Sequence, residues 1–148
     1  DVTHSVISDI VRVTKYHGNE SRLEWDVNNI PHHSSYLSLS DEKGVSKTQP
    51  VDEVKWLYEE QGLPSGLIVS TSCPIPQEDT TQPPHRQAAA YYREVVKALN
   101  GQYVVTMEHP TATKPKPLVI DIDGAGARIR KIAGGVPAVV AAAAPRAG

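Results

Sequence analysis

The chain has 148 residues, of which 39% are hydrophobic and 5% aromatic, and it contains no Phe. This length suits one folded unit with a core of mainly aliphatic side chains, and it excludes two domains of ordinary size. The formal net charge is −2, and no apolar run approaches the roughly eighteen residues of a membrane span. We therefore expect a protein without a membrane-spanning segment.

The net charge hides an asymmetry along the chain. Residues 1–80 carry 6 Lys and Arg against 13 Asp and Glu, a balance of −7, whereas residues 81–148 carry 9 against 4, a balance of +5. Such a division can mark an anionic partner for the basic part, or it can reflect attraction between two parts of one domain. The second interpretation is favoured, because surface charge serves solvation more often than recognition.

The N-terminal part is predicted to form a β-hairpin and a third strand. Residues 22–27, RLEWDV, alternate between apolar and charged side chains, which is typical of a half-buried strand. The β-branched stretch 6–16 is expected to pair with it through a turn at 17–20. A third strand is predicted at 35–40, SYLSLS.

Two helix–Gly–strand units follow at equal spacing. A helix opens at Gln49-Pro50 and ends at Gly62, and a buried strand follows it. A second helix opens at Gln82-Pro83 and ends at Asn100-Gly101, with the strand QYVVTM after it. Together with the strand at 35–40, these units predict a β-α-β-α-β arrangement.

These elements, with a last strand at PLVIDI (117–122), predict an α/β (α+β) fold. We expect a single-domain two-layer sandwich at residues 1–132, with a mixed sheet of about six strands and two main helices. Residues 133–148 are of low complexity, and a fraying terminus or a partner-binding tail is predicted there.

The stretch LVIDIDG, residues 118–124, resembles the first motif of haloacid-dehalogenase-like phosphohydrolases. The resemblance implies that Asp121 is a nucleophile and Asp123 a general acid, with Mg²⁺ beside them. That family places most of its domain after the motif, whereas 25 residues follow Asp123 here. A dinucleotide-binding loop fits no better, because Ile129 stands where the third glycine belongs. The favoured interpretation is a strand end with a glycine turn.

Basic residues surround this stretch and predict an anion-binding patch that could meet phosphates. The patch would consist of Lys114, Lys116, Arg128, Arg130 and Lys131.

Histidines lie at the ends of several predicted elements, where catalytic groups often occur. None has the spacing of metal ligands on a helix, so no metal and no cofactor are predicted. A metal-independent ribonuclease needs a base, an acid and a cation at one phosphate. The residues predicted for that role are His33, His85, Arg86 and Glu108.

Three further features concern compartment and reactivity. Cys73 is the sole cysteine and is predicted to be a small buried hydrophobe. Asn19 opens an N-glycosylation sequon, and Met107 is the sole methionine, so that Asp1 is not a translational start. The single cysteine removes the disulfide signature of a small secreted domain, whereas the sequon and the missing start residue favour a processed, secreted protein.

The leading hypothesis is therefore an interaction protein, such as an effector, toxin or inhibitor, that acts on a protein or RNA partner. The first alternative is the metal-independent ribonuclease, and the second is a metal-dependent phosphohydrolase at Asp121 and Asp123. Whether the protein is an enzyme, and in which oligomeric state it acts, stays open.

Overall fold

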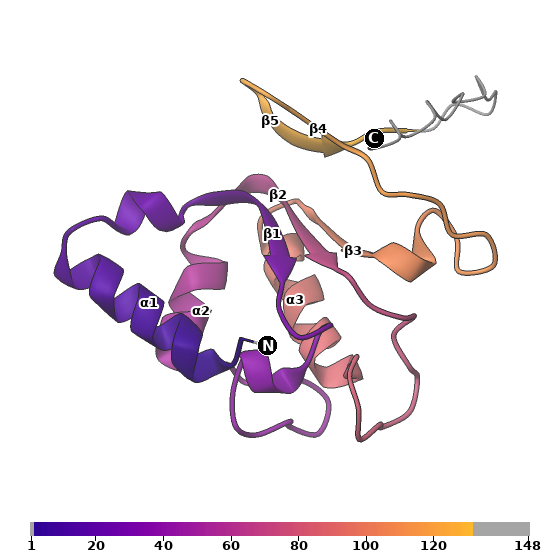
Figure 1. Cartoon of the computed structure of the whole chain (residues 1–148), viewed down its shortest axis with the longest axis horizontal. Helices are drawn as coiled ribbons and strands as arrows, with labels where there is room; N and C mark the ends of the chain where they lie inside the picture. Colours follow the sequence, from indigo (N-terminus) through magenta and orange to yellow (C-terminus); the bar gives the residue numbers. More distant parts are fainter. Residues whose placement is uncertain (1, 132–148) are drawn as a thin grey trace, which may run out of the picture.

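The structure is a computed structural model that describes residues 2–131. These residues form three α-helices and five β-strands, joined by short 3₁₀ turns (Figure 1). The helices are α1 (His4–Tyr16), α2 (Asp52–Glu59) and α3 (Arg86–Ala98). The strands are β1 (Trp25–Ile30), β2 (Gly62–Ser70), β3 (Gln102–Val105), β4 (Ile120–Asp123) and β5 (Gly126–Ile129).

Two separate sheets hold the five strands. The first has the order β1-β2-β3 with both pairs parallel, and the second is the antiparallel hairpin β4-β5. The predicted mixed α/β class is confirmed. The prediction of one six-stranded sheet is wrong, and the two-layer sandwich is not confirmed, because the hairpin forms a sheet of its own. It lies on the face of the first sheet opposite α2 and α3 (Figure 1).

The two helix–Gly–strand units are confirmed. Helix α2 leads into β2 and helix α3 leads into β3, so each helix connects neighbouring parallel strands. The strand that opens the series is β1, however, and not residues 35–40. Those residues contain a 3₁₀ turn at Tyr36–Ser38, which is capped by the Ser35 hydroxyl accepting a hydrogen bond from the Leu37 amide.

The predicted N-terminal strand is a helix, α1. Its buried residues include Ile7, Ser8 and Val11, which recur at helical spacing on one face. The helical spacing of these buried residues outweighs the strand preference of the β-branched residues in the segment. Without a strand before it, β1 pairs in parallel with β2 and not in a hairpin.

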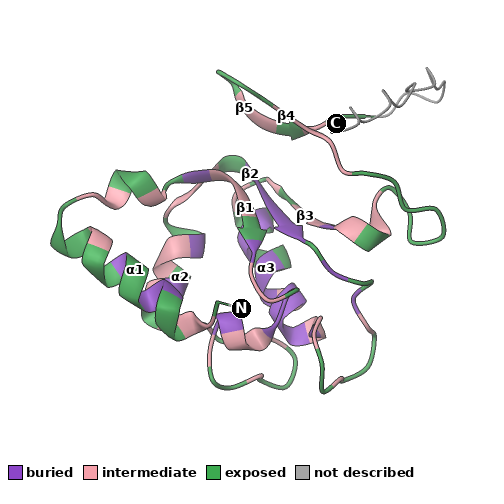
Figure 2. Ribbon diagram, viewed as in Figure 1, coloured by how far each residue is buried: buried purple, intermediate pink, exposed green. Residues whose placement is uncertain are grey.

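The main core lies between the first sheet and the helices (Figure 2). Its centre is a group of tyrosine rings from α2, α3 and β3, in which Tyr92 contacts Tyr58 edge-on and stacks on Tyr103. Burial raises the pKa of Tyr58 to about 12, so this ring system stays uncharged. The expected aliphatic core therefore contains an aromatic centre.

Within residues 2–131, none of the helices has the length and hydropathy needed to cross a bilayer. The division into a domain at 1–132 and a tail stays a prediction. The tail at 133–148 lies outside the described residues.

Candidate functional site

An open groove lies at the carboxyl edge of the first sheet, where the three parallel strands end. It has a volume of about 460 Å³. The residues that follow each strand line it: His33 after β1, Thr71, Ser72 and Cys73 after β2, and Thr106 and Met107 after β3. In open α/β sheets, a ligand cleft often lies where the strand order reverses. The order β1-β2-β3 contains no such reversal. The loops after β1 and β2 form its walls instead.

The loop after β1 has an unusual backbone. His32, His33 and Ser34 have φ angles of 54°, 54° and 65°, which place three consecutive non-glycine residues in the left-handed region. Contacts from other elements hold this turn in place. The Ser34 hydroxyl lies 3.1 Å from the Tyr103 hydroxyl, and the Ser34 carbonyl accepts the His85 amide at 3.0 Å. The turn thus presents His33 to the groove at the cost of local strain.

His33 is anchored through one ring nitrogen. Its Nδ1 lies 2.6 Å from the Thr71 carbonyl oxygen, and since a carbonyl only accepts, Nδ1 donates the hydrogen. In the neutral ring, Nε2 is then the acceptor. This arrangement suits a group that accepts a hydrogen bond or a proton from a ligand.

His85, predicted to work with His33, lies in the core at the start of α3. Its side chain is buried against the Tyr36 ring at 4.9 Å between centroids. Its Nδ1 has no hydrogen-bond partner within the described part of the chain, and Nε2 faces the Thr81 carbonyl at 3.4 Å. Burial lowers the pKa of His85, and this effect outweighs the hydrogen bond to the Thr81 carbonyl, which raises it. The ring is therefore held neutral.

This burial predicts a pH-dependent stability. Since the folded-state pKa of His85 lies below its unfolded value of about 6.5, protonation favours the unfolded chain, and stability should fall as the pH drops below that value. Urea unfolding between about pH 7.5 and about pH 5 should show this loss, and His85→Gln should reduce its slope. The exposed His17 gives the control variant His17→Gln, which should keep the parent slope. Equal slopes in all three proteins would contradict the prediction.

The remaining two residues of the predicted ribonuclease set, Arg86 and Glu108, do not line the groove of His33. Arg86 pairs with Asp79, with 2.9 Å between Nε and Oδ1. Glu108 accepts the Ile75 amide at 2.8 Å and lines a different groove. Of the four predicted residues, His33 alone lines the carboxyl-edge groove.

Cys73 also differs from its predicted environment. The prediction that it is buried is wrong, because its thiol lies exposed on the loop after β2. The preceding Ser72 is the buried residue there, with its hydroxyl 2.8 Å from the Ser70 hydroxyl. A polar residue thus occupies the interior position next to an exposed cysteine.

A second groove runs along the free edge of β3. It has a volume of about 330 Å³, and all four strand residues, Gln102 to Val105, line it. Its other walls are Glu108 and His109 beyond the strand, and Ile129 and Lys131 from the end of the hairpin. Sequence reasoning missed this groove, since a pattern of alternating residues does not show which strand ends up at a sheet edge.

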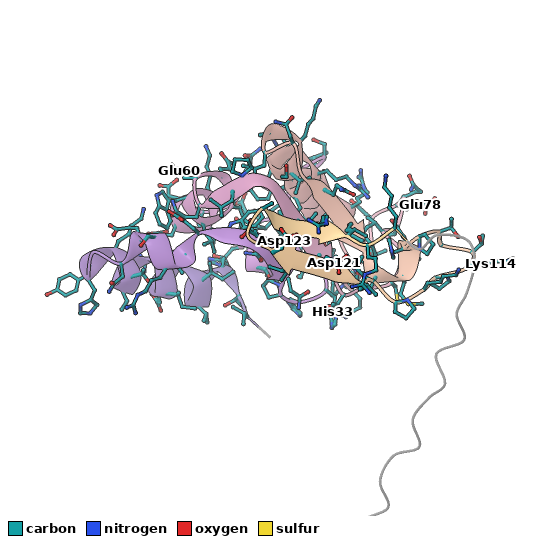
Figure 3. All side chains as sticks on the ribbon, turned by 90° about the horizontal axis from the view of Figure 1, so that it is seen from above. His33, Glu60, Glu78, Lys114, Asp121 and Asp123 are labelled. Carbon is teal, nitrogen blue, oxygen red and sulfur yellow. The ribbon has the colours of Figure 1, made fainter. Side chains whose placement is uncertain are left out.

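The aspartates of the DIDG stretch lie on the β4-β5 hairpin, whereas His33 lies in the loop after β1 (Figure 3). Arg130 donates from Nε to both Asp121 oxygens at 3.1 Å, and this bonding lowers the pKa of Asp121. Asp123 accepts the Ala125 amide and pairs with Arg128 at 2.7 Å, and both contacts lower its pKa. The predicted strand end with a glycine turn is confirmed. No group of three or more metal-binding side chains occurs between residues 2 and 131.

The predicted basic patch divides into residues with different surroundings. Arg128 and Arg130 are engaged by the hairpin aspartates. Lys131 lines the β3-edge groove, and Lys116 lines a third, apolar groove. Lys114 is exposed on the loop between β3 and β4 (Figure 3).

Comparisons with known proteins give no guide to function. No family model, no curated protein and no solved structure matches the chain.

Proposed function

We propose that this protein is an interaction domain that binds an extended segment of a partner protein along the free edge of β3. The observation that supports the proposal best is the groove lined by all four residues of this edge strand. A peptide laid in this groove would add a strand to the sheet, a common mode of peptide recognition.

The backbone of β3 offers hydrogen bonds for an added strand. In a parallel pair, every second residue directs its amide and carbonyl groups away from the neighbouring strand. Within the described part of the chain, residues 102–105 make backbone hydrogen bonds to β2 and to no other segment. These outward groups therefore remain available to a partner.

The side chains that line the β3-edge groove indicate which residues a bound peptide should carry. Lys131 has no ion-pair partner within residues 2–131, and an acidic side chain of a bound peptide would meet it. Val104 and Ile129 line the same groove and offer apolar contacts. We therefore propose an extended segment that alternates apolar and polar residues and carries an acidic residue.

The opposite edge of the sheet suits strand addition less well. The pairing of β1 with β2 shifts register between Trp25 and Val27. Such an irregularity increases the local twist and protects an edge against pairing.

Selection from a displayed random-peptide library tests the proposal. Peptides enriched on the purified protein should share the alternating pattern and an acidic residue, and Lys131→Glu should weaken their binding about five- to tenfold. The matched control is Lys114→Glu, which changes the net charge equally at a position outside the groove. A titration by calorimetry measures each dissociation constant. Failure to enrich any sequence, or equal losses in both variants, would refute the proposal.

The two enzymatic alternatives have less support from the geometry. The ribonuclease hypothesis requires two histidines at one phosphate, and His85 is buried. The phosphohydrolase hypothesis requires free carboxylates, and both hairpin aspartates carry arginine partners.

A secreted location remains part of the proposal. The sequon at Asn19 lies in the turn between α1 and the 3₁₀ helix Glu20–Leu23. A turn between elements is a suitable place for a glycan. Mass spectrometry of the protein from a secretory eukaryotic host, before and after glycosidase treatment, reports whether Asn19 is modified.

A further inference from the structure

A third groove lies on the face of the first sheet that the helices leave open. It has a volume of about 580 Å³, within the usual range of ligand sites. Val27 and Asn29 of β1 and Val69 of β2 form its floor, and the loop at 115–118 with Ile120 forms its wall. It continues to Thr71, Thr106 and Met107, which also line the carboxyl-edge groove.

Among residues 2–131, the lining of this groove is mainly aliphatic and contains no Asp or Glu. Its apolar residues are Val27, Val69, Met107, Pro115, Pro117, Leu118 and Ile120. None of its described lining residues is aromatic, so these residues offer no stacking surface to a flat ligand. A slender aliphatic chain is the ligand shape that matches a groove between a sheet and an extended loop.

A cationic side chain, that of Lys116, lines the wall of the groove. Lys116 lies between two prolines, which hold the loop extended, and its amide donates to the His109 carbonyl at 2.7 Å. Its backbone is thus fixed, while its exposed ammonium group makes no hydrogen bond or ion pair within residues 2–131. An uncompensated cation beside an apolar groove favours an anionic head group on the ligand.

We propose that this groove binds an amphipathic carboxylate of the fatty-acid class, with its aliphatic chain along Val27 and Val69 and its carboxylate against Lys116. The site is distinct from the β3-edge groove, and the proposal of fatty-acid binding does not depend on peptide binding.

Calorimetric titration with dodecanoate below its micelle concentration tests this site. One saturable site is expected. Each methylene added between octanoate and dodecanoate should tighten binding about fourfold, because a buried methylene contributes about 0.8 kcal/mol. Dodecylammonium has the same tail and the opposite charge, and it should bind at least about tenfold more weakly.

Three variants locate the site. Lys116→Glu should weaken dodecanoate binding about tenfold, whereas Lys114→Glu, on the same loop but outside the groove, should stay within about twofold. Asn29→Phe should abolish binding by filling the groove from an exposed strand position. Because Lys116 is exposed, its replacement leaves the fold intact and keeps the test valid if Asn29→Phe does not fold.

Three results would overturn the proposal: no saturable binding, affinity that does not depend on tail length, or equal effects of Lys116→Glu and Lys114→Glu. A peptide selected on the β3 edge should not displace dodecanoate, so failure of one site is distinguishable from failure of the other.

Discussion

Replacing Gly101 by Ala is expected to destabilise the protein by about 3 kcal/mol, near the upper end of overpacking costs. A Cβ atom at this position would lie 2.0 Å from the Gly66 carbonyl oxygen, which is backbone of β2. The chain has little room to move away. The Gly101 amide is bonded to the Val96 carbonyl at 2.7 Å, and the Ser65 amide is bonded to the Leu99 carbonyl at 2.7 Å. Urea unfolding followed by circular dichroism measures the loss.

Gly124 provides the control for this substitution. A Cβ atom there meets no other atom within 4 Å, so Gly124→Ala should change the free energy of unfolding by less than about 0.5 kcal/mol. Equal unfolding midpoints for the two variants would contradict the close approach of Gly101, just before β3, to Gly66 of β2.

Replacing Trp25 by Ala should cost about 4 kcal/mol, a typical loss for a large buried aromatic side chain. Its indole is buried and donates from Nε1 to the Leu57 carbonyl at 2.9 Å. Cβ atoms added at Gly62 and Gly66 would lie 2.7 Å and 2.8 Å from indole carbons, which shows how closely β2 packs on this ring. The variant therefore leaves a cavity and an unpaired carbonyl.

The second tryptophan, Trp56, supplies the comparison. Its ring is half-buried on α2, with the Lys15 ammonium 3.7 Å from the ring centroid. Trp56→Ala loses partial burial and one cation–π contact, so it should cost about 1–2 kcal/mol. Urea unfolding followed by circular dichroism compares the two. A loss at Trp56 equal to that at Trp25 would contradict the assignment of Trp25 to the core.

The helix–Gly–strand units were predictable from sequence because each contains its own local signals. Asp52 and Glu53 mark the start of α2, Gly101 follows α3, and both helices have one apolar face. The N-terminal helix was not predicted, since its β-branched residues favour a strand locally. The spacing of Ile7 and Val11 indicates a helix, and burial of these residues against the rest of the protein favours the helix over the strand.

The candidate sites were less predictable than the fold. His33 was identified from its place before a predicted strand, whereas in the structure it follows β1. Neither the edge position of β3 nor the approach of the hairpin to the sheet can be read from local patterns, because both depend on contacts between distant segments. Lys116 and Lys131 were grouped by their positive charge, yet they line different grooves.

The most direct test of the proposed function is amide hydrogen exchange of Gln102 to Val105, measured with and without a selected peptide. Strand addition predicts slower exchange at every second amide of β3 when the peptide is bound, because those amides point away from β2 and gain a partner. The amides of β1 should exchange at unchanged rates. Peptide binding that leaves the β3 amides unprotected would contradict the proposal and place the binding surface elsewhere.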